Sequence, residues 1–296
     1  MAASTPVPPT LDQVCAQAVR LPCAPALMPR LIAVLEDASS GADDIEGVIQ
    51  LDPALTASTL RLANSAYFGA GRTVETVAQA VVRLGLREIY RLAALALVNR
   101  WETGTNKSGY AGDPGDFCRH ALCTALAAEV LAEFSHQVDP QAAYTAGLVS
   151  DIGKLAVAHA CGAFFPAIRA LQQERSCPWK QAERDVLGYD HAQVGAMLLK
   201  AWRFPVIYTV AAEFAQEPAR APAEAHVLLA HLHAAKFLAA SLGPGVAEDG
   251  FLFVLDESFI AGCGFTPEVL ERSLVTVMER AAARLHDKLT HGAVTL

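Results

Sequence analysis

Apolar residues recur at helical spacing along most of the chain. After the dipeptide Asp52-Pro53, the residues that share one helical face are Leu55, Thr59, Leu62, Ala63 and Ala66. The stretch Val77–Arg100 repeats this pattern, with a break at Gly85. Alternating segments bounded by turn residues, which would indicate a sheet, are not found. The pattern therefore predicts an all-α protein built as a multi-helix bundle.

The starts of several helices can be read directly from the sequence. A residue with a capping oxygen stands before proline at Asp52-Pro53, Asp139-Pro140 and Thr266-Pro267. The side-chain oxygen accepts a backbone N–H that has no partner inside the helix, and proline at the first helical position gives up no hydrogen bond. We expect Pro205 and Pro222 to open two more helices.

Stretches rich in glycine and small polar residues divide the chain into parts. The expected parts are 1–10 as a flexible N-terminus, 11–100 as an N-terminal helical half, 101–116 as a loop, 117–242 as a second helical half and 243–296 as a C-terminal helical extension. The last helix is predicted over Pro267–Leu289.

Composition narrows the class of protein. Of the 296 residues, 53% are hydrophobic and 18% are charged, so a large core can be buried. The net charge of −8 disfavours direct nucleic-acid binding. The seven cysteines are scattered without a CxxC pair, as is typical of reduced thiols. No signal peptide is recognisable in Met1–Pro9, and the longest uncharged stretch, Leu155–Ile168, is too short to span a membrane, so we expect a cytoplasmic protein.

Three stretches resemble the HDOD family, the HD-related output domain of bacterial signalling proteins. Leu51–Gly69 (LDPALTASTLRLANSAYFG) is similar to the family's proline-capped helix and its LANSA-aromatic-aromatic-glycine turn. Thr76–Leu97 is similar to the segment A-hydrophobic-x-x-LG-hydrophobic-R, and Tyr144–Leu155 (YTAGLVSDIGKL) to the AGLLHDIGKL helix of the HD superfamily. Asp190–Pro205 is a further, weaker match. The resemblance covers residues 11–242 and implies an HD-like helical core with an N-terminal helical subdomain.

The residues of the first stretch that form the family signature also have structural explanations. They are Asp52, Pro53, Asn64, Ser65, Tyr67 and Gly69. Asn64 and Ser65 lie near a helix end, where short polar side chains can bond backbone groups. Tyr67 is expected to pack in the core, and Gly69 permits a positive φ. These residues predict a fold better than a function.

The resemblance implies which residues would hold a metal in an active HD hydrolase: a His, a His-Asp pair and a distant Asp. The first His matches His120, the His of the pair is replaced by Ser150, and Asp151 remains. The distant Asp aligns with Ala234, and two histidines of a later motif align with Ala215-Gln216. Because a catalytic divalent ion typically has three or more protein ligands, we expect no metal, no cofactor and no catalytic residue.

The remaining polar residues have simpler explanations as well. Asp151 can bond a helix end or pair with Lys154, and His120 can be a hydrogen-bonded histidine of the core. Asp190 can cap the helix that begins at His191.

A second group of histidines falls on one predicted helix. His226 and His233 are seven residues apart and share a face, whereas His231 points elsewhere. A metal site there would need ligands from another helix, which the sequence does not show.

Three arginines, Arg83, Arg87 and Arg91, recur at every fourth position and would form a basic stripe on one predicted helix. Such a stripe could receive a phosphate-bearing, nucleotide-like ligand or an acidic partner surface. A solvated face that Glu88 partly neutralises explains the same spacing.

The expectation that follows is a non-catalytic output module of signal transduction, of the response-regulator or two-component kind, that binds a signalling protein partner or a small ligand. No receiver or sensor domain is recognisable before residue 11, so input would come from a separate chain or through the helical bundle itself. One alternative is a residual phosphohydrolase of nucleotides or cyclic dinucleotides, in which His191 or Glu213 joins His120 and Asp151 at a metal. Another is a structural scaffold that forms a homo-oligomer.

Overall fold

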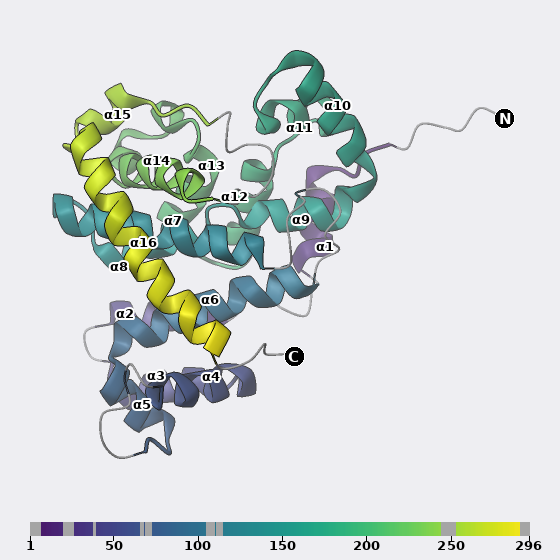
Figure 1. Cartoon of the computed structure of the whole chain (residues 1–296). Helices are drawn as coiled ribbons and strands as arrows, with labels where there is room; N and C mark the ends of the chain where they lie inside the picture. The colour runs from purple at the N-terminus through teal and green to yellow at the C-terminus, as the bar shows by residue number, and fades with distance from the viewer. Residues whose placement is uncertain are drawn as a thin grey trace.

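The computed structural model describes residues 7–19, 27–37, 40–65, 68, 73–104, 110, 115–243 and 253–290. Within these residues every regular element is a helix and no strand occurs, which confirms the all-α prediction. The helices form two groups in Figure 1: α2 to α6 lie in the lower part of the view, and α7 to α15 lie above them. Helix α16 descends from α15 across α7.

The helix bounds are as follows. The N-terminal elements are α1 (Leu11–Val19), α2 (Leu27–Glu36), α3 (Ala42–Ile49), α4 (Pro53–Ala63), α5 (Val77–Leu84) and α6 (Leu86–Gly104). The central elements are α7 (Asp116–Ser135), α8 (Pro140–Val149), α9 (Ile152–Cys161), η1 (Gly162–Phe164), α10 (Phe165–Arg175), α11 (Trp179–Leu187), α12 (His191–Ala201) and α13 (Val206–Phe214). The last elements are η2 (Pro218–Arg220), η3 (Ala223–Ala225), α14 (His226–Ser241), α15 (Glu257–Ala261) and α16 (Pro267–Thr290).

The predicted helix starts are confirmed. Asp52 Oδ1 accepts the N–H of Leu55 at 3.1 Å, and α4 begins at Pro53. The side chains of Asp139 and Thr266 accept backbone N–H groups in the same way at the starts of α8 and α16. Pro205 directly precedes α13, and Pro222 precedes the short η3 that leads into α14. Capping oxygens before proline therefore locate these helices correctly.

Helix α1 packs against α9 and α12, so it belongs in space with the second helical half and not with the first. The residues before it are held as well: Tyr189 donates its hydroxyl to Pro9 O at 2.7 Å. The side chains of Thr10 and Gln13 form reciprocal bonds at the start of α1. Pro9 is thus bonded to the turn before α12, and the flexibility of residues 1–10 stays a prediction. Residues 1–6 lie outside the described part.

The loop expected from residue 101 begins later, because α6 continues through Gly104. Glu102, on the last turn of α6, is buried and accepts the N–H groups of Gly115 and Cys118 at 2.6 and 3.2 Å. Gly115 has no side chain with which to cap α7, so the carboxylate of Glu102 supplies the cap from the preceding helix. One side chain thus fixes how the second half begins relative to the first.

Helix α7 is the centre of the core, where α8, α14 and α16 pack against it. The contact with α8 is close: a Cβ added at Gly147 would lie 2.7 Å from Ala125 Cα. The contact between α9 and α12 is closer still, since a Cβ at Gly153 would lie 1.9 Å from His191 O. Both glycines belong to the stretch that resembles the HD superfamily helix, so backbone proximity explains why glycine stands there.

One stretch, Pro140–Arg175, is long and apolar enough to qualify as a candidate membrane span by length and composition, but 72% of that apolar window is buried inside the protein. The stretch is also divided among α8, α9, η1 and α10. Burial of this kind is typical of the core of a soluble protein.

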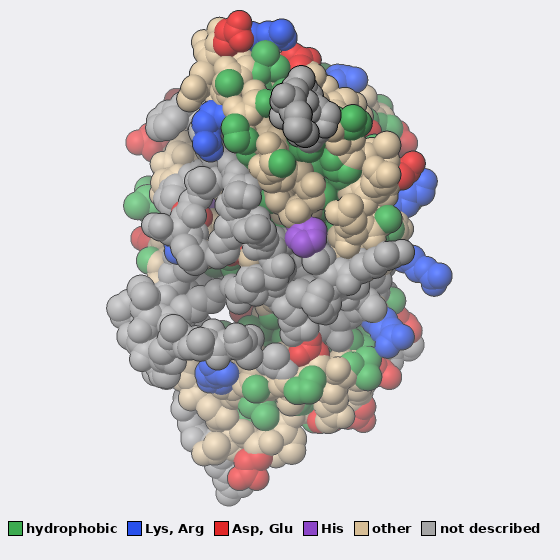
Figure 2. All heavy atoms as spheres, turned by 90° about the vertical axis from the view of Figure 1, so that its right-hand side faces the viewer, with side chains coloured by type: hydrophobic (Ala, Val, Ile, Leu, Met, Phe, Trp, Pro, Cys, Tyr) green, Lys and Arg blue, Asp and Glu red, His purple; other side chains and the backbone are tan. Residues whose placement is uncertain are grey.

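Acidic and basic side chains are interspersed over the described part of the face in Figure 2, and no broad basic patch is visible on it.

Candidate functional site

Asp151 lies between α8 and α9, at the position where the resemblance predicts the remnant of a metal site. Three side chains surround its carboxylate. Lys236 Nζ of α14 is 2.5 Å from Oδ2, Lys154 Nζ of α9 is 3.5 Å from Oδ1, and His120 Nε2 of α7 is 3.5 Å from Oδ2. All four side chains are nine-tenths or more buried. The sequence placed His120 and Asp151 at one site, and the structure brings them together there.

The charges at this site favour an ionised carboxylate without a metal. Burial alone would raise the pKa of Asp151, but Lys154 and Lys236 outweigh it and hold the pKa well below its usual range. Burial lowers the pKa of His120, so its imidazole is neutral at pH 7. Two ammonium groups, one carboxylate and one neutral imidazole therefore share a dry site.

The residues expected at the vestigial site are only partly brought together. Ser150 is adjacent to Asp151, but its hydroxyl donates to Gly147 O at 3.0 Å. The residue of α14 that reaches Asp151 is Lys236 and not Ala234. Residues two positions apart on a helix point about 200° away from each other, so Ala234 is directed elsewhere in the core.

Lys236 was not identified by sequence reasoning, because it is 85 residues from Asp151 along the chain. Asp151 pairs with Lys154 as anticipated, but its side chain makes no capping bond at the start of α9. The capping explanation for Asp151 is therefore wrong. The signal available in the sequence was a lysine inside an apolar helix, which needs a buried partner.

His191 belongs to a separate buried cluster. Its Nδ1 lies 2.6 Å from Glu183 Oε2, and the same carboxylate accepts the indole N–H of Trp179 at 3.1 Å and the hydroxyl of Tyr110. As predicted, Asp190 caps α12 through the N–H of Gln193. His191 is thus positioned by Glu183 and not by the metal-site remnant.

The three histidines of α14 are each bonded to backbone or hydroxyl groups. His226 bonds Ala221 O, and His231 bonds Val227 O and the hydroxyl of Ser135. His233 bonds Ala215 O and accepts the N–H of Asp256, which ties α14 to the segment before α15. Across the described residues, no group of three or more His, Cys, Asp or Glu side chains is arranged to hold a metal.

The predicted arginine stripe is wrong. Gly85, with a φ of 77°, ends α5, so Arg83 lies on α5 while Arg87 and Arg91 lie on α6. Arg91 is buried, pairs with Glu88 and Glu129, and stacks over the ring of Tyr144. Arg83 bonds the carbonyl of Ala63 at 3.3 Å. These arginines do not share a solvated face, because the helix breaks between them and Arg91 turns into the core.

Arg87 is half exposed and lies 3.7 Å from Glu133 Oε1 and 3.9 Å from Glu129 Oε1. Arg280 of α16 reaches the same two glutamates, at 2.7 and 3.5 Å. Glu129 and Glu133 of α7 are therefore each paired with arginines of both α6 and α16.

Of the family signature residues, Asn64 bonds backbone groups near the end of α4 as predicted. Asn64 donates to Leu60 O and Val74 O at 2.9 Å and accepts the N–H of Val74 at 2.8 Å. It thereby closes the segment between α4 and α5. The hydroxyl of Ser65 is buried and makes no hydrogen bond within the described part of the chain. Tyr67 and Gly69 lie outside the described residues.

Comparison with known proteins shows which proteins this chain resembles. A protein of unassigned function from Treponema pallidum (strain Nichols) is 26% identical over 193 residues, which is 64% of this chain and 37% of that protein. The match therefore spans well under two thirds of that relative's length. The structure of a proposed phosphohydrolase from Shewanella amazonensis superposes with a TM-score of 0.66 at 26% identity, over 92% of this chain and 94% of that one.

A proposed signal transduction protein from Marinobacter aquaeolei superposes with a TM-score of 0.73 at 21% identity, over 96% of this chain and 62% of that one. At this identity the likeness shows the fold. The model of the HDOD domain family matches residues 21–218, which include α2 to α13. The chain therefore belongs to the HDOD domain family.

Proposed function

We propose that this chain is a non-catalytic output module of signal transduction, which binds a signalling protein partner or a small ligand through its helical scaffold. The observation that carries the proposal is the contact of 2.5 Å between Lys236 and Asp151. An ammonium group stands beside the acid that a hydrolytic metal would need.

The site does not fit a divalent metal. A metal bound at Asp151 would meet the ammonium groups of Lys236 and Lys154, which lie 2.5 and 3.5 Å from the carboxylate oxygens. Two unit charges 4 Å apart interact by about 4 kcal/mol at an effective dielectric constant of 20, and the metal carries two charges. Replacement of a His by Ser150 removes a further ligand. The remnant therefore favours a fixed internal ion pair over metal-activated water.

The second candidate is a residual phosphohydrolase. It is favoured by the likeness to the Shewanella amazonensis protein, which is described as a proposed phosphohydrolase. For this activity Lys236 would have to leave Asp151, and a third ligand would have to come from elsewhere. His191 is engaged with Glu183, so recruiting it would break a second buried pair.

The two candidates are separated by metal content and turnover. We expect purified protein to carry well under one equivalent of Mn²⁺, Zn²⁺ or Fe, and to leave bis-(p-nitrophenyl) phosphate intact with each metal added. Asp151→Ala should be as inactive as the wild type. A stoichiometric metal, with turnover that Asp151→Ala abolishes, would establish the hydrolase instead.

Partner binding is tested by affinity capture from the native cytoplasm, followed by reconstitution with the purified partner. A direct complex with a micromolar or lower dissociation constant supports the output role. Persistent failure of every captured protein to bind the purified chain argues for the scaffold alternative, which light scattering would reveal as a stable homo-oligomer.

A further inference from the structure

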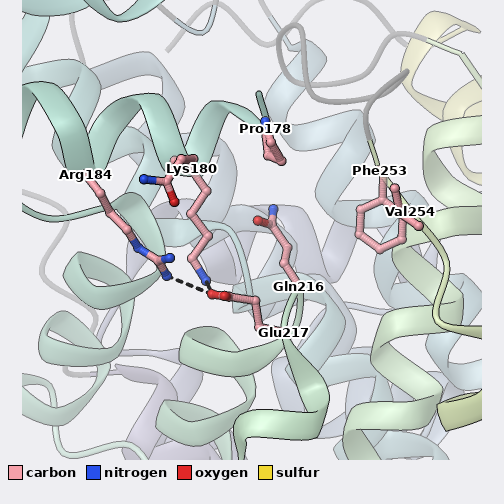
Figure 3. Close-up of a pocket in the computed structure, with 8 residues that line it drawn as sticks. Pro178, Lys180, Arg184, Gln216, Glu217, Phe253 and Val254 are labelled. Atoms are coloured by element: carbon pink, nitrogen blue, oxygen red, sulfur yellow. Dashed lines mark hydrogen bonds and ion pairs between the residues drawn. The ribbon is translucent and has the colours of Figure 1, made fainter. Parts of the chain in front are cut away.

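A cavity of about 190 Å³ lies between the start of α11, the link after α13 and the segment before α15. Figure 3 shows how its lining is arranged: Lys180 and Arg184 reach down from α11 toward Glu217, Gln216 points into the middle, and Phe253 closes the opposite side. The cavity therefore has one cationic wall and one apolar wall.

The cationic wall is held in place by a buried acid. Asp190 is fully buried, caps α12, and accepts Arg184 Nε at 2.6 Å. Lys180 Nζ lies 3.9 Å from the same carboxylate and 3.5 Å from Glu213 O. Asp190 is therefore a buried acid that lies beside both cations, separately from Glu217.

Glu217 occupies the other side of the two cations. Its Oε2 accepts Lys180 Nζ at 2.8 Å and Arg184 Nη2 at 2.7 Å. Partial burial would raise the pKa of Glu217, but the bonds from Arg184 and Lys180 outweigh it and lower the pKa to about 2. The geometry is that of a carboxylate bound between two cations, and the chain itself provides the carboxylate.

The position of Glu217 would allow its carboxylate to move away from Lys180 and Arg184. Its side chain is one-third exposed, and it lies on the link between α13 and η2, not within a helix. Its Oε1 already accepts Arg220 Nη1 at 2.9 Å, and Arg220 is exposed. A rotation toward Arg220 would keep Glu217 paired while freeing Lys180 and Arg184 for another anion.

The apolar wall defines the rest of a ligand. The ring of Phe253 packs at 5.0 Å from the ring of His233, and Pro178 faces it across the cavity. The side-chain amide of Gln216 makes no hydrogen bond within the described part of the chain. A flat ring can pack on Phe253 while a polar edge meets the amide.

We infer that this cavity binds a small phosphomonoester carrying a flat ring, whose phosphate replaces the Glu217 carboxylate on Lys180 and Arg184. The inference deepens the small-ligand part of the proposed function and rests on it. Phe253 belongs to the segment that leads into α15 and α16, and the N–H of Asp256 on that segment is bonded to His233. Ligand contact with Phe253 thus reaches the C-terminal extension directly.

The test is titration calorimetry with phenyl phosphate and with inorganic phosphate, at low salt and in the presence of a chelator. We expect millimolar or tighter binding of phenyl phosphate, with inorganic phosphate weaker. Glu217→Gln should strengthen the binding of both at least about tenfold, equivalent to about 1.4 kcal/mol, because the competing carboxylate is gone. Phe253→Ala should weaken phenyl phosphate and leave inorganic phosphate unchanged.

Arg184→Gln should abolish binding, and the matched control is Arg175→Gln. Arg175 pairs with Asp185 on the surface and does not line the cavity, so its loss should change neither affinity. Circular dichroism checks that each variant is folded. The proposed site would be overturned if folded Glu217→Gln showed no saturable binding of phenyl phosphate. It would also be overturned if folded Arg184→Gln bound phenyl phosphate as tightly as the wild type does. Metal-dependent hydrolysis of phenyl phosphate would instead contradict the proposed function and leave the site standing.

Discussion

Lys236 and Asp151 are separated by 85 residues, and yet the ammonium of one lies 2.5 Å from the carboxylate of the other in the core. Each is at least 95% buried. In a dry environment neither charge is tolerated alone, and removal of one partner from such a pair destabilises a protein by about 3–5 kcal/mol. The pair therefore links α14 to the turn between α8 and α9 inside the core.

Lys236→Met should reduce the free energy of unfolding by about 2–4 kcal/mol. The reduction should be somewhat less than if Asp151 were left with no cation beside it, because Lys154 still faces Asp151. Urea denaturation measures the change. The control is Lys200→Met on the exposed end of α12, which should leave stability nearly unaltered. Adding Asp151→Asn to Lys236→Met should restore part of the loss; additive losses would argue that the two side chains do not interact.

Gly153→Ala should destabilise the protein strongly, because a Cβ there would lie 1.9 Å from His191 O and 2.5 Å from the N of Gly195, and backbone cannot yield as a side chain can. We expect a loss of about 3 kcal/mol or more, read as a fall in melting temperature. Gly47→Ala is the matched control, since it lies in α3 with nothing within 4 Å of the added carbon. It should be neutral or stabilising by up to about 1 kcal/mol. Equal effects of the two would mean that α9 and α12 are not in close contact.

Acid should weaken the fold before any carboxylate titrates. Burial lowers the pKa of His120, His231 and His233 from the ordinary value of 6.5. The unfolded chain therefore binds more protons than the folded one below that pH. Stability is full above about pH 6.5 and falls as the pH drops toward the lower folded values.

The dependence of stability on pH is measured by urea denaturation midpoints between pH 7.5 and 5. His120→Gln should make the urea midpoint less dependent on pH, while His136→Gln should not, because His136 is exposed in the turn after α7. A pH-independent midpoint in the wild type would contradict the assignment of neutral buried histidines.

The sequence predicted local features better than contacts between distant residues. Asp52 caps α4 and Asn64 bonds the segment after α4, as the local sequence indicated. A cap or a turn involves residues only a few positions apart, so the local sequence is enough to predict it. The stripe from Arg83 to Arg91 failed because helical phase is lost at Gly85, where φ is positive. Lys236 was missed because an alignment shifted by two residues on a helix selects the opposite face, and no local rule reveals that shift.

Arg280→Gln should loosen the docking of α16 without unfolding the domain. Arg280 gives α16 its charged contacts to α7, at 2.7 Å to Glu133 and 3.5 Å to Glu129. Glu129 keeps Arg91 and Glu133 keeps Arg87 in the variant, so neither acid is left alone. Arg280 and Glu133 are about one-third exposed, so the contact between α16 and α7 should be weakened by only about 1 kcal/mol. Such a change corresponds to roughly fivefold faster amide exchange along α16.

Hydrogen exchange measured by mass spectrometry separates this local effect from a global one. Peptides from α16 should exchange faster, while those from α8 and α9 should not change. Arg272→Gln, an exposed position on the same helix, should leave exchange unaltered. If Arg280→Gln also leaves α16 unaltered, the apolar contacts of Leu270, Val277 and Ala281 hold the helix without help from charge, and the arginines of α6 and α16 do not act together through α7.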